Sequence, residues 1–401
     1  MKTKRLLALF VSAAVLGNIL TPFAAASGEA SEDLQRDVER YNYVIGTNAI
    51  APGYQFTDAD PLMEVADRVL AWGSNMIKFN VGSDAGLVDR VLEGRSFDYV
   101  FMWFRSNAAF RDGCSEAELR ADYDAFYDLT RHLLQTYNGT GKEFFLGHWE
   151  GDWYYLGGYD KSQEKIDDLV TDSMIAWLNN RQKAVDDAKR DTPHSDVSVW
   201  NYLELNRPSD ALKKGYDRVV NRVLPYTNVD YVSYSAYDSK DGTARTVRQT
   251  VQYIYDNLPE KSGVPGPRVF IGEVAEPASQ FGYNDGRHCR ANLRIIAKYL
   301  QCDVRFVLYW EMYCNETLPD GSPNGFWLID SDGSETQLYR QLGKVFRDGK
   351  EYVERFSEKN GRLPDNREYR EFLLRQPVFL QARIGIFFED IWIRFRALFV
   401  Q

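Results

Sequence analysis

The chain has 401 residues, of which 44% are hydrophobic, 26% are charged and 14% are aromatic, and its formal net charge at pH 7 is −10. This acidic balance argues against a nucleic-acid partner, because proteins that bind nucleic acid usually present a basic patch or stripe. No internal stretch approaches the ~20 consecutive apolar residues of a membrane-spanning helix.

The first residues have the pattern of a secretory signal peptide. Residues 1–5 (MKTKR) are basic, residues 6–20 are apolar, and Ala24 and Ala26 form a small-residue A-x-A pattern before Ser27. Basic, apolar and small-residue regions in this order are typical of a leader that is removed on export. We therefore expect residues 1–26 to be a signal peptide cut after Ala26, and the protein to be secreted or held in the cell envelope. An uncleaved anchor is the alternative that the clear cleavage pattern disfavours.

Four cysteines follow the leader: Cys114, Cys289, Cys302 and Cys314. An exported protein can oxidise its cysteines, and four of them allow three pairings. They form neither a CxxC pair nor a Cys/His cluster with the spacing of a zinc site. We therefore expect no metal site and no cofactor.

Short runs rich in Val, Ile, Phe and Tyr recur along the chain, and each run predicts a buried strand. These runs occupy residues 41–48, 74–81, 97–105, 143–150, 197–205, 230–237, 267–273 and 304–311. Segments with helical periodicity lie between them, at residues 61–73, 115–135, 161–190, 208–224, 245–258, 286–300 and 334–347. The interval 82–96 is short, and its helical pattern is weaker.

Two of these helices carry clear end signals. Pro61 opens the first one and Gly73 closes it, which is the order expected for a helix start and stop. Ser115 precedes another helix and Glu118 follows three positions later, which is the pattern of a capping box.

Strands that alternate with helices predict a parallel sheet. Eight such units can close into a barrel, so we expect an α/β fold of the (β/α)8 TIM-barrel type over residues 40–349. An open doubly wound sheet is the alternative. That fold usually carries a G-x-G-x-x-G loop after its first strand, and residues 46–53 (GTNAIAPG) stand there instead.

Residues 350–401 lie beyond the eight units, and we expect them to form a C-terminal helical extension. Residues 361–369 (GRLPDNREY) read as a linker into a helix, and residues 377–400 mix Phe, Ile and Trp with charged residues. One interpretation is a helix that packs back on the barrel. The other is a helix that contacts a membrane surface or a partner.

Active sites of TIM barrels lie at the C-terminal ends of the strands, so the residues at those ends are the candidates. The fourth run ends in Glu150 and the seventh ends in Glu273. Two carboxyl groups that flank a sugar suit glycoside hydrolysis, in which one protonates the leaving oxygen while the other attacks the anomeric carbon or activates water. Trp149 and Trp153 surround Glu150 with apolar surface, which would raise its pKa and suit the acid. Glu273, at the tip of an apolar run, suits the nucleophile.

The other strand ends supply rings and polar groups for a substrate. We expect the substrate-binding residues to be Trp103, His148, Trp149, Trp153, Asn201, Tyr234, Tyr237, Trp310 and Glu311. Within this set, Tyr234 would hydrogen-bond the nucleophile and Trp310 would stack on a sugar. Two further carboxylates compete for a role: Glu276 follows Glu273 in what reads as a loop, and Glu204 ends the fifth run as a substrate contact.

This arrangement resembles the large clan of retaining glycoside hydrolases with (β/α)8 barrels, and the resemblance covers about residues 40–345. That clan places its acid/base Glu after the fourth strand and its nucleophile Glu after the seventh. The resemblance implies these roles for Glu150 and Glu273. It also implies that Trp310 is the aromatic residue after the eighth strand, and that Tyr234 or Tyr237 is the sixth-strand tyrosine.

Two positions depart from the pattern of the clan. Trp149 stands where most members have Asn directly before the acid/base, and Lys78 stands near the place of the usual second-strand Arg. The expected function is nevertheless a secreted retaining glycosidase that acts on a poly- or oligosaccharide. The alternative is a secreted barrel protein that binds carbohydrate without cleaving it.

Overall fold

The computed structural model describes residues 34, 37–40, 42–105 and 110–397 of the chain. The predicted signal peptide, residues 1–26, lies outside the described residues. No helix in the described part of the chain is both long enough and apolar enough to cross a membrane.

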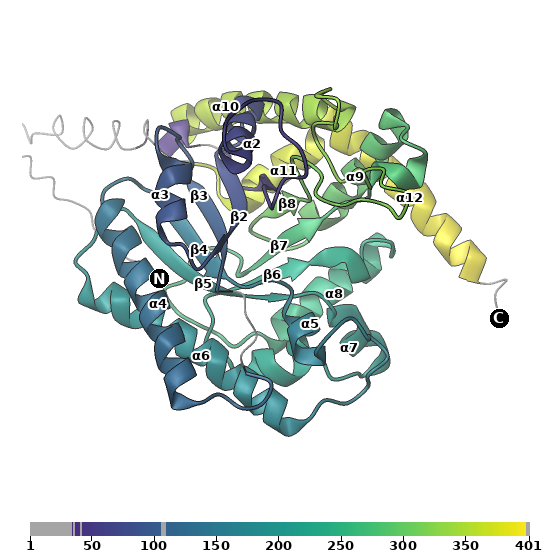
Figure 1. Cartoon of the computed structure of the whole chain (residues 1–401). Coiled ribbons are helices and arrows are strands. Elements are labelled where there is room, and N and C mark those ends of the chain that lie inside the picture. The colour runs from purple at the N-terminus through teal and green to yellow at the C-terminus, as the bar shows by residue number, and fades with distance from the viewer. Residues whose placement is uncertain (1–33, 35–36, 41, 106–109, 398–401) are drawn as a thin grey trace, which may run out of the picture.

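Eight parallel strands close into a barrel in chain order, with helices around it (Figure 1). Closure comes from pairing of the last strand with the first, where Val307 lies opposite Ile45. The TIM barrel predicted from the alternating pattern is therefore confirmed. The strands are β1 (Ile45–Asn48), β2 (Met76–Gly82), β3 (Tyr99–Phe104), β4 (Glu143–Gly147), β5 (Ser198–Leu205), β6 (Tyr231–Ser235), β7 (Val269–Val274) and β8 (Val307–Tyr309).

Helices follow the strands and cover the outside of the barrel (Figure 1). Both predicted end signals are present: Pro61 is the first residue of its helix and Gly73 ends it with a φ of 98°, and Ser115 and Glu118 form a reciprocal capping box. The helices up to β8 are α2 (Pro61–Trp72), α3 (Gly86–Leu92), α4 (Glu116–Thr136), α5 (Gly151–Leu156), α6 (Asp168–Asp191), α7 (Pro208–Lys214), α8 (Ala244–Asn257) and α9 (Asp285–Leu300).

Two connections differ from the sequence prediction. The segment expected as one helix over residues 208–224 is divided: α7 stops at Gly215, which has a φ of 69°, and the chain then forms a π-helical turn (Val219–Val223). The short helix α5 was not predicted. It begins directly after Glu150, so it separates this carboxylate from the long helix that follows.

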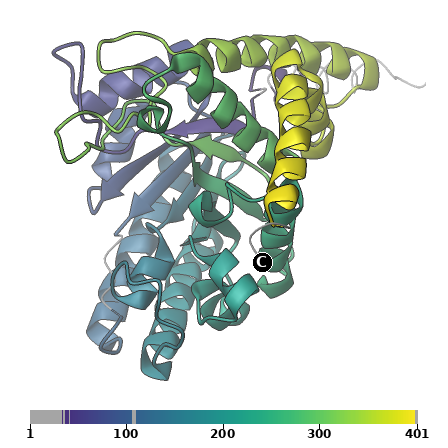
Figure 2. The ribbon, with the colours of Figure 1, turned by 90° about the vertical axis from the view of Figure 1, so that its right-hand side faces the viewer.

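Three helices follow β8: α10 (Gln337–Asn360), α11 (Asn366–Arg375) and α12 (Pro377–Ala397). The predicted boundary between residues 349 and 350 falls inside α10, which continues to Asn360 and ends at Gly361. Figure 2 shows α12 running along the side of the molecule, where it packs against α9.

The inside of the barrel has an apolar layer with a polar layer above it. The rings of Phe101, Phe145, Phe270 and Phe306 are fully buried against one another, and the centroids of the first two are 4.5 Å apart. Because side chains alternate along a strand, every second residue points inward. In β5 this alternation places Tyr202 over the Phe layer and Glu204 in the polar layer.

The four cysteines are free thiols. Three of them, Cys289, Cys302 and Cys314, are buried, and burial raises the pKa of each thiol. A raised pKa keeps a thiol protonated and unreactive, so these residues pack as small apolar side chains.

Candidate active site

Glu150 lies three residues after the end of β4, immediately before α5, and has only 9% of its surface exposed. Its Oε1 accepts a hydrogen bond from Ser235 Oγ at 2.5 Å, and its Oε2 accepts one from Trp153 Nε1 at 2.6 Å. Since Ser235 ends β6 and Trp153 lies in α5, two different elements hold this carboxyl group in one orientation.

Glu273 reaches the same place from β7 and is 3% exposed. Its Oε1 lies 3.4 Å from Lys78 Nζ, and its Oε2 accepts from Ser235 Oγ at 3.4 Å. The hydroxyl of Ser235 thus contacts both carboxyl groups. Because it lies 2.5 Å from Glu150 and 3.4 Å from Glu273, the nearest oxygens of the pair are separated by at most about 6 Å.

A third carboxylate, Glu204, lies fully buried beneath this pair. It accepts four hydrogen bonds: from Lys78 Nζ at 2.7 Å, Ser233 Oγ at 2.7 Å, Trp103 Nε1 at 3.2 Å and the backbone N–H of Glu150 at 3.1 Å. The interpretation of Glu204 as a substrate contact was wrong, because its oxygens are satisfied inside the protein. Its role is to hold the base of the site together, with Lys78 as the buried cation.

The network leaves no room at Gly272, directly before Glu273. A Cβ atom at this position would lie 1.9 Å from Ser233 Oγ and 2.9 Å from Glu204 Oε2. The carbonyl of Gly272 also accepts from Asn48 Nδ2 at 3.1 Å and from Lys78 Nζ at 3.3 Å. Glycine is therefore required where β7 passes this close to the cluster.

Burial changes the proton affinity of the pair. Burial raises the pKa of Glu150 to about 7, and the charge of Glu204 adds to the rise, while hydrogen bonds from Ser235 and Trp153 act against it. Burial also raises the pKa of Glu273, the charges of Glu204 and Glu150 raise it further, and Lys78 opposes the rise. Two carboxyl groups this close interact, so the protons that they bind belong to the pair rather than to either residue.

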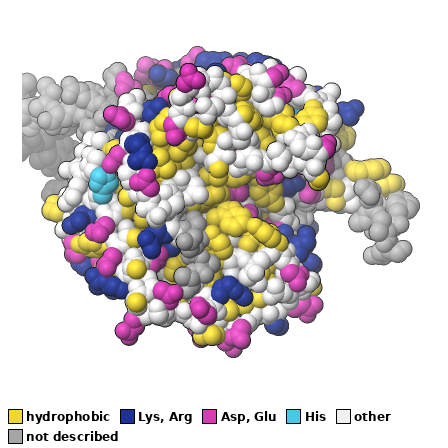
Figure 3. Space-filling view, viewed as in Figure 1, with side chains coloured by type: hydrophobic (Ala, Val, Ile, Leu, Met, Phe, Trp, Pro, Cys, Tyr) yellow, Lys and Arg dark blue, Asp and Glu magenta, His cyan; other side chains and the backbone are white. Residues whose placement is uncertain are grey.

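Aromatic rings surround the carboxylates. Trp149 and Trp153 are half-buried, and their rings pack edge to face against the exposed Tyr159, with centroid distances of 6.5 Å and 5.4 Å. Burial raises the pKa of the Tyr237 phenol, and the charges of Glu273 and Glu150 raise it further. Figure 3 shows hydrophobic side chains in the centre of this face of the molecule and most charged side chains around its rim.

Trp103 and Trp310 form an inner wall. Their ring centroids are 6.2 Å apart, and Lys78 Nζ lies 4.6 Å from the centre of the Trp103 ring. Both rings are buried, at 5% and 7% exposure. Trp103 therefore belongs to the base of the site, where it binds Glu204, rather than to a surface that faces a substrate.

Two predicted substrate-binding residues point away from the site. Tyr234 donates to Ser239 Oγ at 2.6 Å and packs against Tyr299 of α9, and the amide of Asn201 donates to Gln182 of α6 at 3.1 Å. Both predictions were wrong for one reason. Strand residues alternate, and these two occupy the phase that faces the outer helices.

Glu311 and His148 lie in the site region, but their polar atoms contact backbone groups of the protein. Glu311 is fully buried and accepts from the backbone N–H groups of Ile50 and Asn315 at 3.3 Å and 3.2 Å, so it joins two loops. The ring of His148 is 1% exposed, and its Nδ1 lies 2.9 Å from the carbonyl oxygen of Trp149. Burial lowers the pKa of His148 to about 3, so the ring is neutral. Neither residue is placed to bind a substrate, contrary to the prediction.

Ser233 and Ser235 are site residues that the sequence analysis missed. A serine in a strand run carries no signal by itself. However, the residues of β6 alternate between two faces, and only one face points into the barrel. Choosing the face of Ser233 instead of that of Tyr234 would have found both serines.

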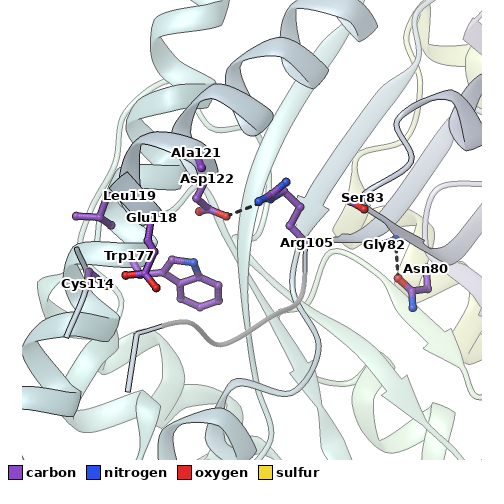
Figure 4. A pocket seen from close by; sticks show the side chains of 10 residues that line it. All are labelled: Asn80, Gly82, Ser83, Arg105, Cys114, Glu118, Leu119, Ala121, Asp122 and Trp177. Atoms are coloured by element: carbon purple, nitrogen blue, oxygen red, sulfur yellow. Dashed lines mark hydrogen bonds and ion pairs between the residues drawn. The ribbon is translucent and has the colours of Figure 1, made fainter. Parts of the chain in front are cut away.

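A separate cavity of about 450 Å³ opens beside the ends of β2 and β3 (Figure 4). Arg105 faces Asp122 across it, with 3.8 Å between Arg105 Nε and Asp122 Oδ1. One of its lining residues, Trp177, has its ring 5.2 Å from that of His148. Within the described ranges, no group of three or more His, Cys, Asp and Glu residues is arranged to hold a metal ion.

No protein-family model matches this chain, and no curated protein matches it either. Among solved structures, a family 39 glycoside hydrolase from Bacteroides cellulosilyticus WH2 has a TM-score of 0.52 and 12% sequence identity, and the match covers 77% of this chain and 64% of that one. A GH39 enzyme from Xanthomonas axonopodis pv. citri has a TM-score of 0.49 and 11% identity, with 77% and 66% covered. A GH5 xyloglucan-specific endo-β-1,4-glucanase from a metagenomic library has a TM-score of 0.47 and 13% identity, with 78% and 99% covered. The likeness is one of fold: the chain shares its TM barrel with glycoside hydrolases.

Proposed function

We propose that this protein is an exported glycosidase that cleaves glycosidic bonds in a poly- or oligosaccharide with retention of configuration. The observation that carries the proposal is the carboxylate pair bridged by Ser235. A separation of at most about 6 Å between the nearest oxygens of Glu150 and Glu273 fits the ~5 to 5.5 Å between carboxyl groups of retaining enzymes. Inverting enzymes need ~6.5 to 9.5 Å, because a water molecule must fit between the sugar and the base. The N-terminal sequence pattern supports export.

In the first step of the proposed reaction, Glu150 gives its proton to the glycosidic oxygen while Glu273 attacks the anomeric carbon. The bond between that carbon and the leaving oxygen breaks, the leaving sugar departs with the proton, and an ester forms between the sugar and Glu273. Lys78, 3.4 Å from Glu273, favours negative charge on the nucleophile, whereas Glu150 accepts only from neutral donors. A proton that the pair binds is therefore better held by Glu150.

In the second step, Glu150 is ionised and takes a proton from water. The water oxygen attacks the anomeric carbon and displaces Glu273 as a carboxylate. Both groups return to their starting states, so the cycle consumes one water and needs no further reactant. The half-buried rings of Trp149 and Trp153 lie at the mouth of the site, where apolar faces can pack on a sugar.

The direct test uses a panel of nitrophenyl glycosides and soluble polysaccharides, with NMR detection of the first anomer released. We expect hydrolysis of at least one member of the panel, with the product first formed in the configuration of its substrate. A product of opposite configuration would refute the double displacement. Saturable binding of a glycan without release of any reducing end would favour the non-catalytic carbohydrate-binding alternative.

The pH profile offers a test of Glu150 as the acid. Because the acid must carry its proton, kcat/KM should fall as the pH rises through about 7, the pKa to which burial raises Glu150. Trp153→Phe removes the N–H that donates to Oε2 and that lowers this pKa. The alkaline limb of the variant should therefore move to higher pH by about one unit, since a hydrogen bond to a charged group contributes about 1.5 kcal/mol.

A matched control for this shift is Trp149→Phe, because the Trp149 ring contacts Tyr154 and Tyr159 while the indole N–H at Glu150 comes from Trp153. Its alkaline limb should stay in place. An unchanged limb in Trp153→Phe, or equal shifts in both variants, would contradict the assignment of Glu150.

A further inference from the structure

Helix α12 is apolar on two sides. Its inner side buries Phe379, Ala382 and Ile386 against the body of the protein, mainly against α9. Its outer side exposes large hydrophobic side chains, each with at least 49% of its surface accessible: Leu380, Ile384, Phe387, Phe388, Ile391, Trp392 and Phe395. A helix that is apolar all round is normally covered on every side, whereas a surface helix of a globular protein keeps one polar face.

The exposed residues form one stripe rather than isolated contacts. Leu380, Ile384, Phe387, Ile391 and Phe395 recur at intervals of three and four positions, and Phe388 and Trp392 lie directly beside this row, so all seven lie on one face of the helix. They are seven of the thirteen large hydrophobic residues that are exposed in the described part of the chain, and the other six are scattered over different elements. Figure 3 shows hydrophobic side chains on the projecting end of this helix. A contiguous apolar patch of this kind marks an interaction surface.

The two acidic residues of α12 contact the body of the protein. Glu389 pairs with Lys298 at 3.4 Å and with Arg294 at 3.7 Å, and Asp390 accepts from the backbone N–H of Ala244 at 3.1 Å. Both carboxylates are thus turned toward the body. The other charged residues that the sequence places in the helix are Arg383, Arg394 and Arg396, and Arg383 is exposed.

We propose that the outer face of α12 lies on the surface of a membrane that contains anionic lipid, and that it holds the barrel beside that membrane. The stripe offers Phe, Ile and Leu for insertion between lipids, and Trp392 and Phe395, with ring centroids 6.3 Å apart, suit the boundary between headgroups and acyl chains. The excess of arginine in the helix attracts anionic headgroups.

A flat partner fits the shape of this helix. Figures 1 and 2 show α12 on the outside of the molecule, with its C-terminal end projecting past the other helices, so an extended surface can approach it. A second copy of the chain is the competing occupant of this stripe, and the sedimentation measurement below distinguishes it from a membrane.

The test is cosedimentation of the full chain with vesicles of phosphatidylcholine alone and of phosphatidylcholine with an equal amount of phosphatidylglycerol. We expect partition into the anionic vesicles, weakened by salt, and little partition into the neutral ones. In the triple variant Phe387→Ser/Phe388→Ser/Trp392→Ser, partition into anionic vesicles should fall at least about tenfold, because three large apolar side chains no longer insert. Every variant keeps residues 1–26 of the parent, so this segment contributes equally to each measurement.

A matched control replaces three exposed hydrophobic residues elsewhere, as Leu169→Ser/Leu212→Ser/Tyr226→Ser. This variant should partition like the parent, and both triple variants should unfold at the parent's temperature, since the replaced side chains are exposed. Equal partition of the parent and the α12 variant would overturn the proposal, as would equal partition into neutral and anionic vesicles. A dimer in sedimentation equilibrium that the α12 variant loses, without vesicle binding by the parent, would overturn it in favour of self-association.

Discussion

Replacing Glu273 with Gln should reduce kcat/KM by more than about 10⁴-fold and leave the protein folded. The amide has the shape of the carboxyl group but cannot attack the anomeric carbon. The amide fills the same space, its oxygen can still accept from Ser235, and Lys78 keeps its ion pair with Glu204, so the fold should be retained. Steady-state kinetics on the best substrate of the panel, together with thermal unfolding, would measure both effects.

The chain supplies a matched control for this variant in Glu276, three residues further on. Glu276 is buried beside Lys240, with which it forms an ion pair, and its backbone N–H donates to Asn292 Oδ1 at 2.8 Å. Glu276→Gln should therefore keep kcat/KM within about threefold of the parent. In a second test, azide added to Glu273→Gly should restore turnover and give a glycosyl azide of inverted configuration, because the small anion takes the place of the missing nucleophile. Full activity of Glu273→Gln, or loss of activity only in Glu276→Gln, would refute the assignment.

Replacing Lys78 with Met should lower the free energy of unfolding by about 3 to 5 kcal/mol and remove most of the activity. Lys78 is fully buried between two carboxylates, at 2.7 Å from Glu204 Oε2 and 3.4 Å from Glu273 Oε1. Without its ammonium group these two acids face each other in a dry interior, where an unpaired charge is costly. The pKa of Glu273 should rise further, so the acidic limb of the pH profile should move upward. Denaturant unfolding and the pH dependence of kcat/KM check the two effects.

Two companion variants separate the buried charge from a general loss of packing. Lys240→Met removes the cation of the nearly buried ion pair with Glu276, so it should lower stability while activity remains. Adding Glu204→Gln to Lys78→Met should recover part of the lost stability, with a coupling of about 1 to 3 kcal/mol, because one of the unpaired acids is gone. Additive losses in the double variant would show that the charge of Lys78 is not what stabilises the cluster.

The local sequence pattern was enough to place each candidate carboxylate at the end of a strand. Short β-rich runs that alternate with capped amphipathic segments favour a parallel barrel, and in such a barrel strand ends meet at one face. Glu150 and Glu273 could therefore be placed on that face although 123 positions separate them in the sequence. The helix starts at Pro61 and Ser115 could be predicted for a similar reason, since a helix cap depends on residues within one turn.

The direction of each side chain was decided by the closed barrel. A strand run tells which residues alternate but not which phase faces inward, so Tyr234 and Asn201 were placed in the site while Ser233 and Ser235 were missed. The ion pair between Lys78 and Glu204 could not be predicted from local pattern, because the two residues are 126 positions apart and meet only inside the closed barrel.

The amino-acid pattern was sufficient to predict the order of strands and helices, most helix ends and the two acidic residues at the ends of the fourth and seventh strands, because these depend on periodicity and on contacts within a turn. The folded barrel was needed to show that one buried lysine contacts two acids, that one serine contacts both members of the candidate pair, and that α12 has an exposed apolar face. The physical reason is that burial, charge pairing and exposure are properties of a residue's neighbours in space, and closure of the barrel brings those neighbours together from distant parts of the chain.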